Sequence, residues 1–437
     1  MTRSQRQNTS TMDKIQNNSA QLIPNLRHIR IFGLLAEGRT LTAAAEEIGL
    51  SQPAVTQGLS NLEKYFGTDL CIRQRTGTFL TDSGEILKKR VKRVFEHLME
   101  AIAELPGLDR RERARIERSI TSSQLQALVA ITEYSSFSAG ARATGIAVPT
   151  IHRAARDLER IVGQTFFEQT SFGIKPTRTA ARFAQKIQLA FSELEQARSE
   201  IAALHGTGTG NITVGAMPLA RSHLAPQAIS IFCRENKGHR VAIVEGPFET
   251  LLHDLKRGAI DFLIGAARRD LASQGVIQSH LFNDPLSILM RPGHPLADVE
   301  RLTVDRLKEF PWVAPRADSP LRRHFDLMFE EKGLTPPEDI VECNSLSASR
   351  VLLMNDDRLM LLSDAQARYE LRTGLLLSRH LANREETERP IMLFTRRDWH
   401  PTFAQQRLVD IIKRLALEEP QKEMRPPGGS TRGPQSA

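Results

Sequence analysis

The sequence predicts a multidomain protein in which two copies of an all-α domain precede a larger α/β domain. Three observations support this prediction. Residues of the first half recur at a spacing of 96, each recurring segment leads into a long amphipathic helix, and strands alternate with helices over roughly the last 200 residues. The chain has 437 residues, enough for several domains, and its formal net charge of +8 favours a polyanionic partner.

The repeat aligns without a gap. Conservative pairs such as Val55 with Ile151 lie between positions that are identical in the two copies. The identical residues of the first copy include Ala43, Ala45, Gly49, Pro53, Leu62, Glu63, Gly67 and Thr81, which fall on Ala139, Ala141, Gly145, Pro149, Leu158, Glu159, Gly163 and Thr177. Chance does not preserve that many spacings, so the first half indicates a duplicated domain.

The first copy begins with a pattern of three short helices. Apolar residues three positions apart give Ile29–Leu35 one buried face, and a second helix is expected over Leu41–Ile48. Gly49 permits a tight turn after it, because glycine adopts a positive φ without steric cost. Ser51 is then the expected N-cap of a third helix, with Pro53 in its first turn.

The third helix has an apolar inner face and a polar outer face. Val55, Leu59 and Leu62 face inward, whereas short hydrogen-bonding side chains remain outside. A helix in the major groove of DNA needs such an outer face to reach base edges. The residues predicted to contact double-stranded DNA from this helix are Ser51, Gln52, Pro53, Ala54, Thr56, Gln57 and Ser60.

A two-stranded wing is expected from Gly67 to Phe79, and its Arg73 and Arg75 are placed to contact phosphates. The alternative is a three-helix bundle that binds another protein. The small residues Ala45 and Gly49 at this spacing favour a helix-turn-helix.

Each copy continues into a helix with an apolar stripe. The first stripe runs from Leu87 to Leu105 and stops at Pro106-Gly107. The second alternates steps of four and three residues, which makes a heptad seam of Phe183, Ile187, Ala190, Leu194, Ala197, Ile201 and Leu204. The simplest partner for this seam is a second copy of itself, so we expect a homodimer; packing against its own domain is the alternative.

The second half is typical of an α/β domain with largely parallel strands. The expected strands are Ile212–Val214, Val241–Val244, Phe262–Ile264, Ile288–Met290, Ile340–Val341, Met360–Leu362 and Ile391–Phe394. The expected helices are Leu219–Arg234, Thr250–Arg257, Leu321–Lys332, Leu346–Met354 and Phe403–Leu417. The segment 205–210 lacks the Gly-Lys-Ser/Thr of a phosphate-binding loop, so we interpret it as a linker.

Ligands of open α/β folds lie beyond the carboxyl ends of parallel strands, where helix N-termini offer free N–H groups. The residues expected there are Ala216, Met217, Gly246, Phe248, Arg316, Ser319 and Ser345. Arg316 suits a carboxylate, a phosphate or a sugar hydroxyl. Ser319 and Ser345 have an alternative role, which is only to cap helices.

These motifs resemble those of LysR-type transcription regulators. Residues 22–105 resemble the family's winged helix-turn-helix through LTAAAEEIGLSQPAVTQGLSNLEKYFGTDLCIR and LTDSGE. Residues 211–416 resemble its two-lobed, periplasmic-binding-protein-like effector domain through ITVGA, LKRGAIDFLIG, RPGHPLA and FPWV, and are most like the regulators named for a galactose-binding protein.

The resemblance implies a sequence-specific regulator that binds double-stranded DNA and responds to a small-molecule effector, such as a sugar or an organic acid, held between two lobes. It also implies a homodimer or tetramer that acts on RNA polymerase. The expected fold is therefore two all-α winged helix-turn-helix domains followed by an α/β two-lobed periplasmic-binding-protein-like effector domain.

The second copy departs from the family, whose ordinary members carry one winged helix-turn-helix domain. The N-cap Ser51 becomes Ala147, and the wing arginines become Gln169 and Ser171. Basic residues remain on its third helix and wing, namely Arg153, Arg156, Arg160, Lys175 and Arg178. Arg153 and Arg156 are candidate DNA contacts; a solvated face without DNA contact is the alternative.

No enzyme is expected, and no cofactor or metal. The sequence lacks a Gly-x-Ser-x-Gly elbow, a dinucleotide fingerprint and a metal-ligand cluster. Three isolated cysteines, the absence of a membrane-length apolar run and a polar N-terminus predict a cytoplasmic protein without a membrane partner. The rival classes are an enzyme whose site the sequence hides and an architectural DNA binder that senses nothing.

The expected domain boundaries follow from these assignments. A disordered start at 1–21 precedes the first winged helix-turn-helix at 22–84 and its linker or dimerisation helix at 85–118. The degenerate second copy at 119–182 has its own linker or dimerisation helix at 183–206. The effector-binding domain spans 207–418, and a disordered tail spans 419–437.

Overall fold

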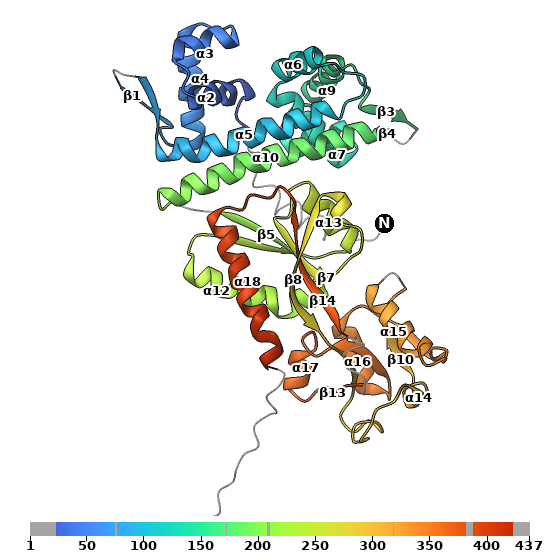
Figure 1. Ribbon diagram of the computed structural model, residues 1–437. Helices are drawn as coiled ribbons and strands as arrows, with labels where there is room; N and C mark the ends of the chain where they lie inside the picture. The colour runs from blue at the N-terminus through green and yellow to red at the C-terminus, as the bar shows by residue number, and fades with distance from the viewer. Residues whose placement is uncertain are drawn as a thin grey trace, which may run out of the picture. The chain divides into compact units, whose positions relative to one another are not determined.

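The computed structural model describes residues 23–74, 77–171, 173–207, 210–317, 319–381 and 388–422. They form two compact units. Unit 1 contains the residues up to Asn211 together with Lys256–Ala259, and unit 2 contains Ile212–Leu255 and the residues from Ile260 onward. Unit 1 consists mainly of helices, whereas unit 2 contains both five-stranded sheets (Figure 1).

The first half of unit 1 has the three helices and the hairpin that the sequence predicts. They are α2 (Leu26–Ala36), α3 (Leu41–Ile48), α4 (Gln52–Phe66), β1 (Cys71–Gln74) and β2 (Gly77–Leu80), followed by the long helix α5 (Asp82–Ala103). Gly49 ends α3 with a φ of 71°, the left-handed conformation that glycine tolerates best. The predicted N-cap is also confirmed, because Ser51 Oγ accepts a hydrogen bond from the Ala54 N–H.

The second half of unit 1 has the same order of elements. After α6 (Arg110–Ser119) come α7 (Ser122–Tyr134), α8 (Phe137–Thr144), α9 (Val148–Val162), β3 (Phe167–Thr170), β4 (Gly173–Pro176) and α10 (Arg178–Leu204). One hydrogen-bond motif recurs at the spacing of 96. Glu63 Oε1 accepts from the N–H groups of Leu70 and Cys71, and Glu159 Oε1 accepts from those of Phe166 and Phe167. The same side chain therefore fixes the start of each hairpin.

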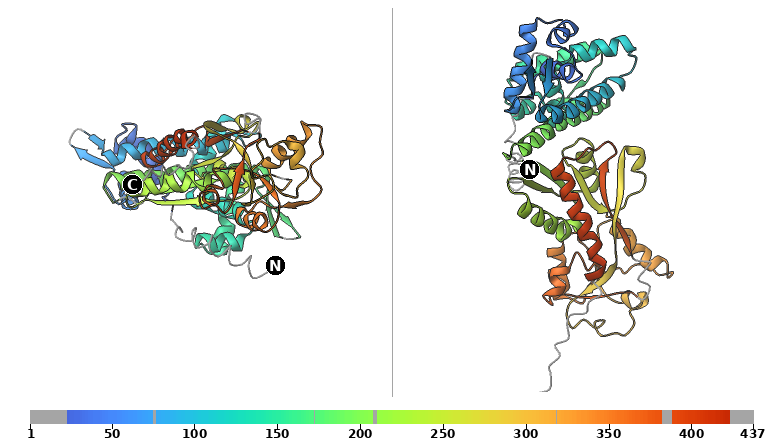
Figure 2. Two further views of the ribbon diagram at one scale, coloured as in Figure 1. Left: turned by 90° about the horizontal axis from the view of Figure 1, so that it is seen from below. Right: turned by 60° about the vertical axis from the view of Figure 1, so that its left-hand side comes forward.

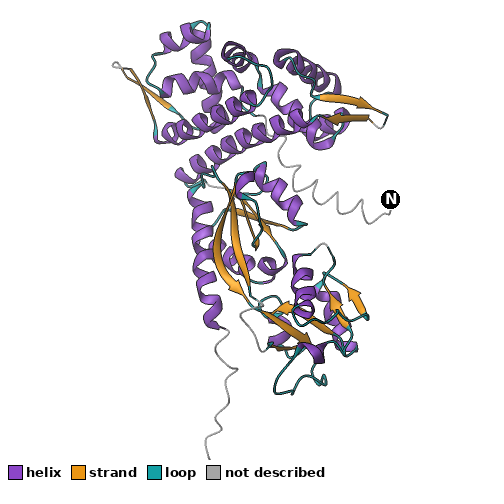
Figure 3. Cartoon of the chain, turned by 45° about the vertical axis from the view of Figure 1, so that its right-hand side comes forward, coloured by secondary structure: helices purple, strands orange, loops and turns teal. Residues whose placement is uncertain are grey.

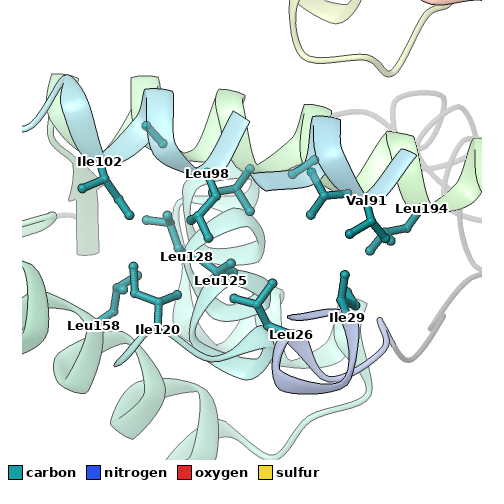
Figure 4. Packing of buried hydrophobic residues seen from close by; sticks show 14 of the residues in the cluster. Leu26, Ile29, Val91, Leu98, Ile102, Ile120, Leu125, Leu128, Leu158 and Leu194 are labelled. Atoms are coloured by element: carbon teal, nitrogen blue, oxygen red, sulfur yellow. The ribbon is translucent and has the colours of Figure 1, made fainter. Parts of the chain in front are cut away.

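The long helices α5 and α10 pack along each other and share one core with both halves (Figure 3). Figure 4 shows Leu26, Leu98 and Leu128 converging on this core. The heptad seam of α10 is buried in it from Phe183 to Ile201, and only Leu204, 48% exposed, lies outside. The expectation that this seam pairs with a second chain is therefore wrong. The apolar stripe of α5 and the helix α7 already cover it within the same chain.

Unit 2 has two lobes, each with a five-stranded sheet. Lobe I has the strand order β6-β5-β7-β14-β8, with β5 (Asn211–Ala216), β6 (Arg240–Val244), β7 (Phe262–Ala266), β8 (Val276–Asp284) and β14 (Arg389–Arg396). Lobe II has the order β11-β10-β12-β9-β13, with β9 (Leu286–Met290), β10 (Trp312–Ala314), β11 (Ile340–Glu342), β12 (Leu359–Ser363) and β13 (Leu377–Arg379). All seven predicted strands are present.

The prediction of largely parallel strands needs correction. β5 runs parallel to β7, and β10 runs parallel to β11 and β12. However, β14 is antiparallel to β7 and β8, and β9 is antiparallel to β12 and β13. The chain leaves lobe I after β8 and returns to it at β14. The strands at these crossings run against their neighbours, so both sheets are mixed.

Helices cover both faces of the lobe I sheet (Figures 1 and 2). Along β7, Phe262 and Ile264 pack with α12 (Leu224–Glu235) and α18 (Phe403–Lys422), whereas Leu263 packs with α13 (Phe248–Lys256). A short helix, α11 (Pro218–Ser222), precedes α12. Lobe II carries α14 (Val304–Leu307), α15 (Pro320–Glu330), α16 (Leu346–Asn355) and α17 (Arg368–Arg372).

The chain ends expected to be disordered are only partly described. Residues 1–21 and 423–437 lie outside the described residues. The helix α18 reaches Lys422, so residues 419–422 are helical and not disordered as expected, because the helix continues beyond its last apolar turn. Within the described ranges, no helix is both long and apolar enough to cross a membrane.

Candidate nucleic-acid interface and ligand cleft

The outer face of α4 carries the predicted base-contacting residues. Val55, Leu59 and Leu62 are buried against the other helices and fix the inner face. The side chains of Ser51, Gln52, Pro53, Ala54 and Gln57 are exposed, and those of Thr56 and Ser60 are half-buried. The Gln57 Nε2 donates to Asn61 Oδ1 at 3.0 Å, an exposed contact that a base edge can replace. The face therefore offers amide and hydroxyl groups to a duplex.

The predicted wing is present, but the structure describes only one of its two predicted arginines. Arg73 lies in β1, where it pairs with Thr78 of β2, and Arg75 lies outside the described residues. The hairpin also exposes two apolar side chains that sequence reasoning missed. Ile72 is 49% exposed and Phe79 is 48% exposed, and they are direct partners across the strands. Their strand neighbours Cys71 and Leu80 pair with each other on the less exposed face, so the two-residue period of a strand is the signal that would have placed Ile72 and Phe79 on the solvent side.

The helix α9 presents a different outer face. Ile151, Ala155 and Leu158 are buried, while Arg153 and Arg156 are exposed as the sequence predicts. Arg156 forms an ion pair with Glu159 at 2.7 Å, one turn further along the helix. The N-cap position of α9 is Ala147, which makes no side-chain capping bond. This face is basic where that of α4 is neutral.

A cavity of about 820 Å³ lies between the two lobes of unit 2, within the size range of small-molecule sites. It is lined by six of the seven predicted effector-binding residues, namely Ala216, Met217, Gly246, Phe248, Arg316 and Ser319. Ser319 also caps α15 by accepting a hydrogen bond from the Leu321 N–H. Ser345 is not part of the lining; its Oγ accepts from the Ala348 N–H and caps α16.

Three arginines face this cavity. The guanidinium carbon of Arg268 lies 4.4 Å from the centre of the Phe248 ring. Arg389 donates to Asp284 at 2.7 Å and so forms an ion pair with it. Burial lowers the pKa of Arg268, partly offset by the Glu249 carboxylate, yet a guanidinium remains protonated in proteins. In the described part of the chain Arg268 and Arg316 form no ion pair, so their charge is available to an anionic ligand.

Sequence reasoning missed Arg268 and Arg389, although both arise from strand ends. Arg268 follows β7 directly, and the rule that named the other junctions applies to it as well. Arg389 begins β14, which runs antiparallel to β7, so its start lies beside the end of β7 where Ile391 pairs with Ala266. The sequence does not reveal the direction of a strand, so it could not predict that Arg389 lies at the cavity.

Two family models match the chain. The model described as "LysR substrate binding domain" matches residues 205–416, and the model described as "Bacterial regulatory helix-turn-helix protein, lysR family" matches residues 26–85 and 122–181. The HTH-type transcriptional regulator GalR of Pseudomonas putida is 34% identical over 354 residues, which are 81% of this chain and 88% of that protein. The chain belongs to the LysR family.

Other similarities to LysR-family proteins agree with this assignment. The HTH-type transcriptional regulator PcaQ of Agrobacterium fabrum is 24% identical over 303 residues, covering 69% of this chain and 97% of that protein. A full-length OxyR variant from Pseudomonas aeruginosa has a similar fold, with a TM-score of 0.52 and 22% identity over 67% of this chain and 98% of that chain.

Membership of the LysR family confirms the resemblance drawn from the motifs. The chain is a DNA-binding transcription regulator with an effector-binding domain. Regulators of this family bind DNA and small-molecule effectors and form oligomers.

Proposed function

We propose that the protein recognises a specific operator with α4 and adjusts transcription when a small anionic molecule binds between the lobes of unit 2. The observation that carries the proposal is the two-sided character of α4. Its apolar residues hold the helix in place, and its exposed amides and hydroxyls remain available to base edges. Such a regulator would act on chromosomal DNA in the cytoplasm, alter the access of RNA polymerase and catalyse no reaction.

The proposal also assigns residues 119–182 to a second winged helix-turn-helix that arose by duplication, with Arg153 and Arg156 as its DNA contacts. The recurring Glu63 and Glu159 hydrogen bonds support it, as does the match of the helix-turn-helix model to residues 122–181. The 354 residues aligned with GalR are more than residues 205–416 and one 96-residue repeat together contain. The boundaries 22–84 for the first winged helix-turn-helix and 207–418 for the effector-binding domain are proposed likewise.

An organic acid fits the proposed effector site better than a neutral sugar. Arg268 and Arg316 bring two positive charges to the cavity against the single carboxylate of Glu249, and Phe248 offers an apolar surface beside them. Charge-assisted hydrogen bonds from arginine to a carboxylate are stronger than those to a hydroxyl group. The protein would thus bind a small carboxylate with an apolar part.

Operator recognition is tested with a Gln52→Ala/Gln57→Ala variant. We expect its affinity for the selected operator to fall by about 2–6 kcal/mol with a changed base preference, because each of the two amides makes a base-specific contact worth about 1–3 kcal/mol. The salt dependence of binding should stay the same, since no phosphate contact is removed. Fluorescence-anisotropy titrations against the operator and its single-base variants, at several salt concentrations, measure both quantities.

The matched control is Gln406→Ala. Gln406 donates to Asp410 four residues later on the exposed face of α18, as Gln57 donates to Asn61, but it lies in the other unit. This control should leave affinity and base preference unchanged. If the α4 variant also kept its base preference, α4 would not be the reading helix and the proposed function would fail.

A further inference from the structure

The two long helices of unit 1 run antiparallel and join the two copies of the repeat. Arg90, near the start of α5, donates to Glu193 at 2.8 Å and to Glu200, near the end of α10, at 2.9 Å. Glu100, near the end of α5, accepts from Lys186, near the start of α10. The contacts therefore run in opposite directions along the two helices.

These contacts occur in equivalent pairs when each residue is replaced by its counterpart in the other copy. Adding 96 to Arg90 gives Lys186, and subtracting 96 from Gln196 gives Glu100. Arg90 donates to Gln196 at 2.6 Å, and Lys186 donates to Glu100 at 2.5 Å. The two pairs are thus the same contact with the copies exchanged. This reciprocity defines a two-fold, or isologous, interface.

Residues on such an axis must contact their own counterparts, and two do. The ring of His97 lies 3.9 Å from the carboxylate of Glu193, 96 residues later. The backbone N–H of Leu26 donates to Ser122 Oγ at 2.7 Å, again with a separation of 96. The two copies are therefore related by an internal two-fold axis that passes near both pairs.

The interface between the copies is complete within one chain. Residues of α2, α5, α7 and α10 belong to one buried cluster, and the seam of α10 is covered from Phe183 to Ile201. The two hairpins lie at opposite ends of the α5–α10 pair (Figures 1 and 3). Unit 1 of a single chain thus presents two recognition helices, α4 and α9, with the symmetry of a dimer.

The two recognition helices differ in chemistry despite this symmetry. The exposed side of α4 carries Gln52 and Gln57, and that of α9 carries Arg153 and Arg156. Glutamine pairs best with the N6 and N7 edge of adenine, whereas arginine pairs best with the O6 and N7 edge of guanine. Identical chains in a symmetric dimer read two identical half-sites, but these helices would read different ones.

We propose that one chain reads one complete, asymmetric operator, with an A·T-containing half-site bound by α4 and a G·C-containing half-site bound by α9. The inference rests on the proposed function, since both helices must bind DNA. It implies that α4 and α9 together bind a non-palindromic duplex, and that no second chain is needed to supply the second recognition helix.

Selection of binding sites from random duplexes by the full chain tests this inference. We expect two unlike sequence motifs at a fixed spacing. The Arg153→Ala/Arg156→Ala variant should lose discrimination at the guanine-containing motif by about 30-fold or more and keep the other motif. The Gln52→Ala/Gln57→Ala variant should show the reverse. Lys413→Ala/Arg414→Ala, which removes equal charge from the exposed side of α18, should change neither motif.

A stoichiometric titration completes the test. A duplex that holds one selected site is titrated with the full chain far above the dissociation constant, and we expect saturation at one duplex per chain. This ratio holds whether or not chains also associate through unit 2. A palindromic motif, or saturation at one duplex per two chains, would overturn the inference and leave the proposed function intact. No enriched motif at all would instead contradict the proposed function.

Discussion

Arg268 and Arg316 bring two positive charges to the cleft against the one carboxylate of Glu249, and we propose that this excess favours an anionic ligand. We predict that Arg316→Ala weakens binding of a carboxylate effector by about 1.5–3 kcal/mol, the value of a hydrogen bond to a charged group. A thermal-shift screen of small carboxylates identifies the ligand, and calorimetric titration of wild type and variant measures the loss.

Arg407→Ala is the control for this prediction. Arg407 pairs with Glu235 at 3.0 Å on the surface, and neither residue lines the cavity. Its removal should leave effector affinity unchanged. Equal affinity of the Arg316→Ala variant and wild type would remove this arginine from the effector site.

Single residues with a local role could be predicted from the sequence. The cap Ser51 and the turn residue Gly49 act on groups within a few positions of themselves, so their patterns are visible in the chain. Arg389 could not be predicted, because its place in the cleft depends on the antiparallel direction of β14. The double role of Ser319, as helix cap and as part of the cavity wall, likewise needed the fold.

At the scale of elements, a buried ionic cluster joins α5 to α10. The side chains of Arg90 and Glu193 are 6% and 7% exposed, and Arg93 also donates to Glu193 at 2.7 Å. Burial would raise the pKa of the Glu193 carboxyl, but the nearby His97 ring and hydrogen bonds from Arg90 and Arg93 hold it at about 2. The Glu193 carboxylate therefore stays ionised in this buried site only while its hydrogen-bond donors are present.

Arg90→Ala should lower the free energy of unfolding of unit 1 by about 3–5 kcal/mol, because it leaves buried carboxylate charge without its main partner. Lys92→Ala is the matched control on the same helix. Lys92 pairs with Glu96 at 3.9 Å with 79% and 47% of the side chains exposed, and such a pair contributes about 0–1 kcal/mol. Urea unfolding followed by far-ultraviolet circular dichroism measures both. Similar losses for the two variants would contradict the role assigned to burial.

The heptad seam of α10 shows that a sequence pattern predicts which face of a helix is buried but not what buries it. The pattern correctly predicts an apolar stripe from Phe183 to Ile201, and that stripe is buried. A stripe does not identify its partner, however. The partner is α5, whose own apolar stripe is also visible in the sequence. Only the reciprocal contacts of Arg90 with Gln196 and of Lys186 with Glu100 show that the two helices pair with each other.

At the scale of the whole molecule, the two units can be followed with different probes. Both tryptophans, Trp312 and Trp399, lie in unit 2, so tryptophan fluorescence reports the unfolding of that unit. Trp399 packs on Phe262, the residue after Asp261, with ring centres 5.9 Å apart. Asp261 accepts hydrogen bonds from the Thr213 N–H and from Gln405, both at 2.8 Å, and so joins β5 to α18.

This carboxyl should make the stability of unit 2 fall with rising pH. Burial raises the pKa of Asp261 to about 6 from 3.8, despite hydrogen bonds from Thr213 and Gln405 and the charge of Arg396. Between these values the folded state binds one proton more than the unfolded state, so stability present below pH 3.8 is lost as the pH rises through 6. Relative to Asp261→Asn, wild type should lose about 3 kcal/mol between about pH 4 and pH 7.

Urea titrations of wild type and Asp261→Asn, followed by tryptophan fluorescence across this range, measure the difference directly. Asp410→Asn removes an exposed carboxylate from α18 in the same unit, so its difference from wild type should stay nearly constant with pH. The comparison between variants matters because burial also lowers the pKa of His294 and His324, which adds an opposite slope common to all three proteins. A wild-type difference from Asp261→Asn that does not change with pH would mean that Asp261 stays ionised when buried, held by Arg396 and its hydrogen bonds.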